Sequence, residues 1–217
     1  MSNGSTHSGR IVIADDHPLF RTALGHAVGA AWPDAEKVEA ASAAEARAAV
    51  EQGADCLLLD LHMEDSHGLS ALMDFRQDFP AVPVVIVSAS EEARVYTAAA
   101  QLGASAFIPK SASLDDMREA LTAVRDGDSW FPETEEEPDE DLARIASLTP
   151  AQRRILDHMR GGLLNKQIAY ELDISEATVK AHITAIFRKL NVISRTQAAM
   201  LSAKLDVDQP AANAGPG

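Results

Sequence analysis

The stretch from Gly162 to His182 reads GLLNKQIAYELDISEATVKAH and carries the signals of two short helices separated by a tight turn. Asn165 is a favourable cap for a helix that ends near Leu172, and Ser175 is a favourable cap for a second helix. Two helices joined in this way form a helix-turn-helix, whose second helix enters the major groove of DNA. The stretch therefore predicts a helical domain that binds DNA.

The helix that begins at Ser175 has two different faces. Its large apolar residues recur at spacings of four, three and four, which puts Val179, Ile183, Ile186 and Leu190 on one stripe. The opposite face is small, polar and cationic, which suits a major groove, although an amphipathic helix with a solvated outer face shows the same pattern. We expect bases to be read mainly by Lys180, Ala181 and Thr184. The full set of expected DNA contacts is Lys166, Thr178, Lys180, Ala181, Thr184, Arg188, Lys189 and Arg195.

Residues 148–205 as a whole predict an all-α domain of four helices. The first begins with a capping box formed by Thr149 and Gln152, with a proline at the first helical position. The fourth follows Ser194, another favourable cap. The remaining residues, 206–217, are rich in Ala, Gly and Pro and are expected to be a disordered tail.

Residues 10–127 alternate between short apolar runs and stretches of helical length that are rich in Ala, Leu and Glu. Alternation of this kind predicts an α/β fold, here a (βα)5 doubly wound parallel sheet with helices on both faces. The predicted strands are 11–14, 37–40, 56–59, 82–87 and 104–108. The predicted helices are 17–31, 43–52, 67–79, 91–102 and 113–126.

Five polar residues stand at or just after the ends of four of these strands: Asp15, Asp16, Asp60, Ser88 and Lys110. In a parallel sheet the carboxyl ends of the strands meet at one edge, where ligands bind. Three carboxylates without cysteine or clustered histidine favour a hard cation, and Mg²⁺ fits best. An aspartate beside such a cation can act as a nucleophile and form an acyl phosphate, with lysine and serine holding the phosphate oxygens.

The two predicted domains differ in charge. Residues 1–147 hold 10 Lys and Arg against 27 Asp and Glu, whereas 148–217 hold 9 against 6, within a chain of formal net charge −14. Between the domains, residues 128–147 are expected to be an acidic linker, since the run from Pro132 to Asp141 cannot form a core. The linker is a solvated spacer or a regulatory element, and residues 139–147 within it can form a short helix.

The composition of the 217-residue chain indicates an intracellular protein. Its single cysteine, Cys56, lies in an apolar run and is expected to be a core residue rather than a catalytic thiol. No apolar run approaches the roughly 20 residues of a membrane span, and the first residues lack the apolar core of a signal peptide. We therefore expect a cytoplasmic location and no membrane partner.

On these residues, the N-terminal part resembles a response-regulator receiver domain over 10–127. The resemblance implies that Asp15 and Asp16 bind the metal and that Asp60, in the sequence LLDLHM, accepts the phosphoryl group. It also implies roles for Ser88 and Lys110 at the phosphate. Two further implied roles are a switch aromatic at Phe107 and a metal ligand in the backbone carbonyl of His62.

The loop after Asp60 departs from the family pattern, which commonly has proline where this chain has Glu64. Asp65, Ser66 and His67 then precede a glycine. The extra acid at Glu64 is expected to alter metal affinity or the lifetime of the phosphorylated state. The histidines at 62 and 67 raise transition-metal binding as a lesser alternative.

The C-terminal part resembles the LuxR/NarL-type helix-turn-helix through LTPAQ at 148–152, NKQIA at 165–169, ISEATVKAH at 174–182 and RKL at 188–190. Relatives carry Val and Lys where this chain has Ala181 and Thr184, so the target sequence is not transferable. In this family the last helix is the usual dimer contact, here through Ala198, Ala199, Leu201 and Leu205.

Together the two resemblances imply a transcription regulator of a two-component system, and not an enzyme. A histidine kinase would phosphorylate Asp60, and the phosphorylated chain would form a homodimer on double-stranded promoter DNA. One alternative is an atypical receiver that controls DNA binding through a ligand or protein without phosphorylation, which Glu64 favours. A phosphatase with Asp60 as nucleophile is disfavoured, because such enzymes need a second acid where this chain has His62.

Overall fold

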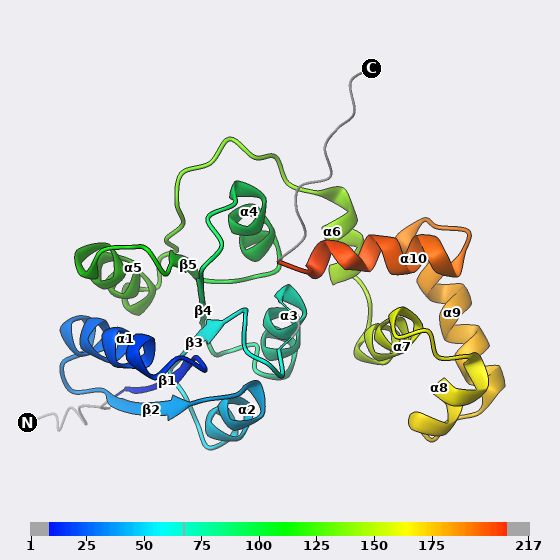
Figure 1. Cartoon of the computed structure of the whole chain (residues 1–217), viewed down its shortest axis with the longest axis horizontal. Coiled ribbons are helices and arrows are strands. Elements are labelled where there is room, and N and C mark those ends of the chain that lie inside the picture. The colour runs from blue at the N-terminus through cyan, green and yellow to red at the C-terminus, as the bar shows by residue number, and fades with distance from the viewer. Residues whose placement is uncertain (1–8, 67, 208–217) are drawn as a thin grey trace, which may run out of the picture. The chain divides into compact units, whose positions relative to one another are not determined.

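The computed structural model describes residues 9–66 and 68–207. The chain divides into two compact units, Met1–Pro138 and Asp139–Gly217, and each has its own core. Figure 1 labels the helices and strands of both units.

The first unit is a five-stranded parallel sheet in the order β2-β1-β3-β4-β5, with helices on both faces, as predicted (Figure 1). α1 and α5 pack together on one face, and α3 and α4 pack together on the other. The strands are β1 (Arg10–Ala14), β2 (Glu36–Ala40), β3 (Cys56–Asp60), β4 (Val84–Ser88) and β5 (Ala106–Pro109). The helices are α1 (Pro18–Ala31), α2 (Ala43–Glu51), α3 (Leu69–Asp78), α4 (Ala93–Gln101) and α5 (Leu114–Asp126).

The central strands are continuous apolar runs because both of their faces are covered. All five residues of β3 and all five of β4 are buried. Cys56 at the start of β3 is fully buried, as predicted, and pairs in register with Ile11 of β1. This core fixes the strand ends rigidly, and the polar residues that follow them form the first site.

The two edge strands avoid pairing with other chains in different ways. β2 presents the charged residues Glu36, Lys37 and Glu39 to solvent. The edge of β5 is covered by Trp130, which forms a parallel bridge with Ala106. The segment just after α5 therefore belongs to the sheet of the first unit.

The second unit is all-helical and built around the predicted helix-turn-helix (Figure 1). Its largest apolar contacts join α9 to α7 and α8, through buried residues such as Ile155, Ile168 and Ile186. The elements are α6 (Glu140–Ala146), α7 (Pro150–Arg160), α8 (Asn165–Glu171), α9 (Glu176–Leu190), α10 (Arg195–Ser202) and the 3-10 helix η1 (Ala203–Leu205).

Three of the predicted helix caps are confirmed. Thr149 forms the capping box of α7, Ser175 accepts the backbone N–H of Thr178, and Ser194 caps α10. The prediction for Asn165 is wrong, because Leu164 occupies the cap position of α8. The side chain of Gln167 accepts the backbone N–H of Leu164 at 2.7 Å, which satisfies that end of the helix without Asn165.

The boundary between linker and second domain also differs from the expectation of 128–147. Helix α6 starts at Glu140 and belongs to the second unit, with Leu142 and Ile145 buried and in contact with α9. The Lys204 ammonium at the end of the domain contacts the carboxylates of Asp139 at 2.7 Å and Asp141 at 2.6 Å. The acids of 139–141 therefore help to close the domain, although their composition resembles that of the preceding linker.

Residues 206 and 207, expected to belong to a disordered tail, are ordered parts of the second unit. Asp206 accepts two hydrogen bonds from Arg160, at 2.7 and 2.9 Å, and Val207 is buried. The rest of that expectation, 208–217, lies outside the described residues.

Candidate functional site

The structure brings the five polar residues at the strand ends together at one edge of the sheet. Asp15 follows β1, Asp60 and Ser88 end β3 and β4, and Lys110 follows β5. Asp15, Asp60 and Ser88 are fully buried. Buried carboxylates are stable only where charge and hydrogen bonds compensate them, so this arrangement needs cations close by.

Lys110 supplies the positive charge in this pocket. Its Nζ lies 2.7 Å from Oδ2 of Asp15 and 2.8 Å from Oδ2 of Asp60, and it sits 4.9 Å from the ring centre of Phe20. Burial lowers the pKa of Lys110, but hydrogen bonds and charge attraction from the two aspartates outweigh it, so the pKa is raised. The lysine is therefore held as a cation between the two carboxylates.

The other oxygen of Asp60 faces the loop after β3. Its Oδ1 accepts the backbone N–H of His62 at 3.0 Å. The ring Nδ1 of His62 lies 3.4 Å from Oγ of Ser88, which also accepts the backbone N–H of Ser90 at 3.1 Å. Asp60 is thus fixed at both oxygens, and Ser88 stands beside it with its hydroxyl engaged.

Four side chains in this pocket form a possible cation site. Donor atoms of Asp15, Asp16, His17 and Asp60 lie within 4.8 Å of one another. Oδ2 of Asp15 is buried and lacks a hydrogen bond of good geometry, although Lys110 is within ion-pair distance. One lysine cannot neutralise three carboxylates, so the oxygen-rich donor set fits a hard divalent cation such as Mg²⁺.

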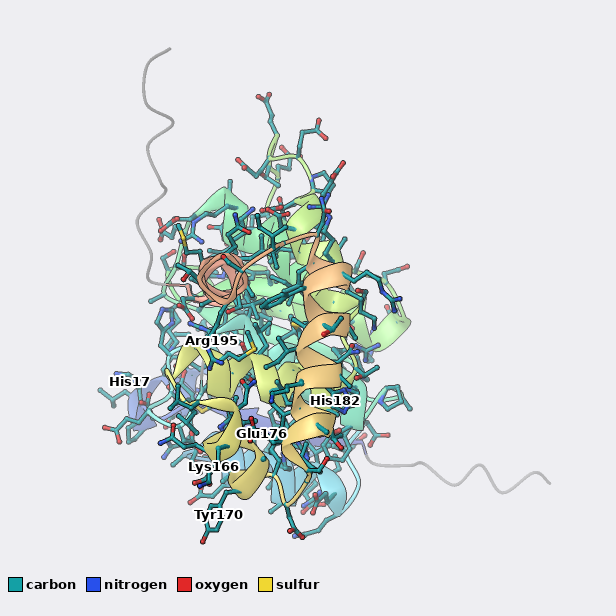
Figure 2. The ribbon with its side chains drawn as sticks, turned by 90° about the vertical axis from the view of Figure 1, so that its right-hand side faces the viewer. His17, Lys166, Tyr170, Glu176, His182 and Arg195 are labelled. Carbon is teal, nitrogen blue, oxygen red and sulfur yellow. The ribbon has the colours of Figure 1, made fainter. Side chains whose placement is uncertain are left out.

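His17 is a member of this cluster that the sequence analysis missed. Its Nδ1 lies 2.5 Å from Oδ1 of Asp16, and its backbone N–H donates to Asp15 at 2.7 Å. The imidazole is largely exposed, and Figure 2 labels it. Its place directly after the acidic pair was the available signal.

The two acids in the loop after Asp60, Glu64 and Asp65, have different surroundings. Glu64 is exposed. Asp65 accepts the backbone N–H groups of Ala43 at 2.8 Å and Ala44 at 3.0 Å, which are the first residues of α2. Asp65 therefore caps the neighbouring helix from outside it and fastens the loop that carries His62. Residue 67, the other histidine considered for transition metals, lies outside the described residues.

Replacing Asp65 with Ala is expected to lower the free energy of unfolding of the first unit by about 1 kcal/mol, the usual cost of losing a helix cap. Urea unfolding followed by tryptophan fluorescence measures this directly, because Trp32 and Trp130 both lie in that unit. The matched control is Glu64→Ala, an exposed neighbour whose loss should change stability by less than about 0.5 kcal/mol. Equal stability of the two variants would contradict the capping role.

Phe107 lies in β5, pairs in register with Ile86 of β4 and is fully buried. Its ring centre is 4.6 Å from that of Tyr96 in α4, at an interplanar angle of 53°. The ring therefore packs against the helix that follows β4, the strand that ends at Ser88.

The second candidate site is the outer face of α9. Along it, Val179, Ile186 and Leu190 are buried and Ile183 is half-buried, as the apolar stripe predicted. Six of the eight residues expected to contact DNA are exposed: Lys166 in α8, then Thr178, Lys180, Ala181, Thr184 and Arg188 in α9. Lys180 pairs with Glu176 at 3.1 Å, and Thr184 donates its hydroxyl to the Lys180 carbonyl at 3.0 Å. Figure 2 shows Lys166 and Tyr170 projecting from α8 near the start of α9, where Glu176 lies.

Two residues expected to bind DNA are instead engaged within the domain. Nζ of Lys189 donates to the Ser147 carbonyl at 2.7 Å. The Arg195 guanidinium donates to the carbonyl of Leu163 and approaches Oδ1 of Asn165 at 3.5 Å. Both cations join segments that are distant in sequence, a structural use that their place near α9 did not reveal.

Two family models match the chain, one in each unit. The family model described as response regulator receiver domain matches residues 11–122, and the model described as bacterial regulatory proteins, luxR family, matches residues 146–202. The chain belongs to the response regulators that join a receiver domain to a LuxR-type helix-turn-helix.

Individual relatives match over almost the whole chain. A glycerol metabolism activator from Pseudomonas putida is 38% identical over 212 residues, covering 91% of this chain and 96% of the relative. The nitrate/nitrite response regulator NarP from Escherichia coli is 32% identical over 209 residues, covering 88% and 93%. The structure of two RcsB dimers bound to two parallel DNAs shares the fold with a TM-score of 0.54 at 20% identity, covering 91% of this chain and 98% of that one.

The chain is therefore a DNA-binding transcription regulator of the two-component type, and its relatives are transcription regulators. Within residues 9–66 and 68–207, no helix combines the length and apolar character that crossing a membrane requires.

Proposed function

We propose that this chain is switched by phosphorylation of Asp60, with a histidine kinase as the phosphoryl donor. The observation that carries the proposal is the geometry around this carboxylate. It is buried at a strand end, bonded to Lys110 at 2.8 Å and to the His62 N–H at 3.0 Å, and next to the acidic pair. Incubation with acetyl phosphate and Mg²⁺, followed by intact-mass measurement, tests it.

In the proposed step a carboxylate oxygen of Asp60 attacks the phosphorus of a phosphohistidine. The new O–P bond forms an acyl phosphate, while the P–N bond breaks and the imidazole nitrogen keeps the electron pair. We expect Lys110 and Ser88 to hold phosphate oxygens, because Lys110 contacts Asp60 at 2.8 Å and Ser88 follows Val87, the residue of β4 that pairs with Asp60. Asp15, Asp16 and the backbone of His62 would hold Mg²⁺, which shields the negative charges that meet in this step.

The proposed switch then passes from Ser88 to Phe107. To donate to a phosphoryl oxygen, the Ser88 hydroxyl leaves its position near His62, and the space it vacates lies beside β5. Phe107 and its neighbour Tyr96 are expected to repack there, which changes the surface of α4 and β5. The charge of a phosphoryl group on Asp60 would thereby shift the equilibrium between two packing arrangements of Phe107 and Tyr96.

The proposed output is a homodimer bound to double-stranded promoter DNA. Because that DNA lies in the bacterial cytoplasm, we propose a cytoplasmic location. Of the four residues expected at the dimer contact, Ala198 and Leu205 are buried within the domain and are left out. Ala199 and Leu201 are half-buried and Met200 beside them is 70% exposed, which supports α10 as the dimer contact. The exposed face of α9 supports base reading by Lys180, Ala181 and Thr184, and phosphate contacts by Lys166, Thr178 and Arg188. Lys189 and Arg195 are left out, since their side chains hold the domain together.

Two substitutions on α9 are expected to separate base reading from phosphate contact. Thr184→Ala should change the ranking of target sequences, because a groove-facing side chain is lost. Arg188→Ala should weaken all targets alike and reduce the slope of log affinity against log salt by about one. Competition binding at two salt concentrations measures both effects. The reverse pattern would mean that α9 docks in a different orientation.

A further inference from the structure

The segment that follows α5 returns to the sheet and pairs with β5. The backbone N–H of Phe107 donates to the carbonyl of Trp130 at 3.0 Å, and the N–H of Trp130 donates to the carbonyl of Ser105 at 3.2 Å. These two bonds make Trp130 a one-residue extension of the sheet, beyond its edge strand. Figure 1 shows the chain passing β5 and then running by α4.

The same segment is fastened on both sides of β5. The indole N–H of Trp130 donates to Glu119 of α5 at 3.4 Å, and its ring packs against the core. Further along, the carbonyl of Glu136 accepts the hydroxyl of Thr97 in α4 at 3.4 Å. We call residues 130–136 the strap; it lies across α5, β5 and α4 within the first unit.

Phe107 is connected to the strap by two separate routes. Its backbone N–H bonds directly to Trp130. Its ring packs on Tyr96, and the next residue of α4, Thr97, holds Glu136. A repacking of Phe107 therefore acts on both ends of the strap, through the main chain of β5 and through α4.

The contacts of the strap are suited to reversible release. Apart from the exposed contact to Glu119, the hydrogen bonds of the strap are neutral, and its residues 133–136 are all solvent-exposed. Three of its seven residues, Glu133, Glu135 and Glu136, are glutamates, whose mutual repulsion favours an extended, detached segment. The Trp130 ring, half-buried against the core, is the main attachment.

We propose that the surface formed by α4, β5 and α5 is a docking site for the strap, and that phosphorylation at Asp60 releases it. This inference rests on the proposed phosphorylation. The linker then carries the signal itself, because release lengthens the chain available between the two units. Trp130 is the residue that couples Phe107 to that change.

Fluorescence of Trp130 tests the release without disturbing the strap. The chain has two tryptophans, so Trp32→Phe leaves Trp130 as the sole emitter in the full chain. On addition of Mg²⁺ and beryllium trifluoride, a mimic of the phosphoryl group, acrylamide quenching of Trp130 should rise by about twofold or more as the ring leaves the core. The same additions to the chain that also carries Asp60→Asn should change nothing.

DNA binding tests whether the strap carries the signal. The ratio of DNA affinity with the mimic to affinity without it should fall by about threefold or more in Trp130→Ala, because the coupling free energy is lost. Trp32→Ala is the matched control, since it removes another half-buried tryptophan from the same core, away from β5, and should keep the ratio.

Intact mass and Trp130 quenching together distinguish a strap that is not released from an Asp60 that is not phosphorylated. A chain that gains the mass of a phosphoryl group on Asp60 but shows unchanged quenching of Trp130 would overturn the strap and leave the phosphorylation site intact. An equal fall of the DNA ratio in both tryptophan variants would also overturn it, because the effect would then reflect general destabilisation.

Discussion

Asp60→Asn is expected to abolish phosphorylation of the chain. The asparagine amide keeps the size of the side chain but lacks the nucleophilic carboxylate oxygen that forms the acyl phosphate. Among the described residues, Asp15 and Asp60 are the buried carboxylates that contact Lys110, and Asp60 is the one that ends β3 and accepts the backbone N–H of His62. Incubation with acetyl phosphate and Mg²⁺, with intact mass as the readout, should show one phosphoryl group on the wild type and none on the variant.

Asp55→Asn is the matched control for this experiment. It stands at the opposite end of the same strand, where its carboxylate accepts the backbone N–H of Arg10 at 2.7 Å. This variant should be phosphorylated like the wild type. Undiminished uptake by Asp60→Asn would refute the assignment. A wild-type chain that takes no phosphate, yet binds DNA under the control of another ligand, would favour the atypical receiver instead.

A fragment of residues 139–217 is expected to bind target DNA more tightly than the unphosphorylated full chain. The affinity of a protein for DNA depends largely on neutralising phosphates. Residues 1–138 hold 9 Lys and Arg against 24 Asp and Glu, so they repel the DNA or compete for the cationic face of α9. The gain should be on the order of tenfold at about 50 mM salt and should shrink as salt rises, because screening weakens exposed charges.

The fragment must begin at Asp139 for the comparison to be valid. A start at 143 would remove the buried Leu142 and the carboxylates of Asp139 and Asp141 that hold Lys204. A second variant separates the effect of the linker charges on DNA affinity from that of the receiver charges. It is the full chain with four glutamates changed to Gln: Glu133, Glu135, Glu136 and Glu137. Equal affinity of fragment and full chain at low salt would exclude electrostatic inhibition and leave the linker as a solvated spacer.

The fold was predictable from the sequence because its signals are local. The apolar runs that became β3 and β4 are buried on both faces, so their sequences identify them without knowledge of their neighbours. The parallel arrangement then brings strand ends together, and Asp15, Asp60 and Lys110 meet as that topology requires.

The residues that the sequence analysis missed or misplaced depend on partners distant in the chain. Asp65 caps α2 from a loop more than 20 residues away. Lys189 reaches Ser147, and Arg195 reaches Leu163. A favourable residue type does not reveal such contacts, because only the folded backbone decides which carbonyl or N–H is in reach.

The acidic composition of the linker misled in a related way. Residues 139–141 continue the run of acids from 133–137, so charge alone assigns them to the same segment. Their carboxylates face Lys204 and Arg144, and the two apolar residues that follow, Leu142 and Ile145, enter the core of the second unit. The burial of Leu142 and Ile145 therefore decides that this segment belongs to the second unit, although its acidic composition resembles that of the linker.

The buried position of Cys56 makes the native chain a convenient starting point for site-specific labelling. Burial, reinforced by the negative charge of Asp55, raises the pKa of this thiol to about 12, and it is the only cysteine in the sequence. At neutral pH the thiol therefore stays protonated, and its side chain is fully buried, so maleimide dyes leave it unmodified. A cysteine introduced by Met200→Cys, at a side chain that is 70% exposed, would therefore be the one site that takes a dye. Energy transfer between two labelled copies then tests the proposed pairing along α10 with every native residue but Met200 in place.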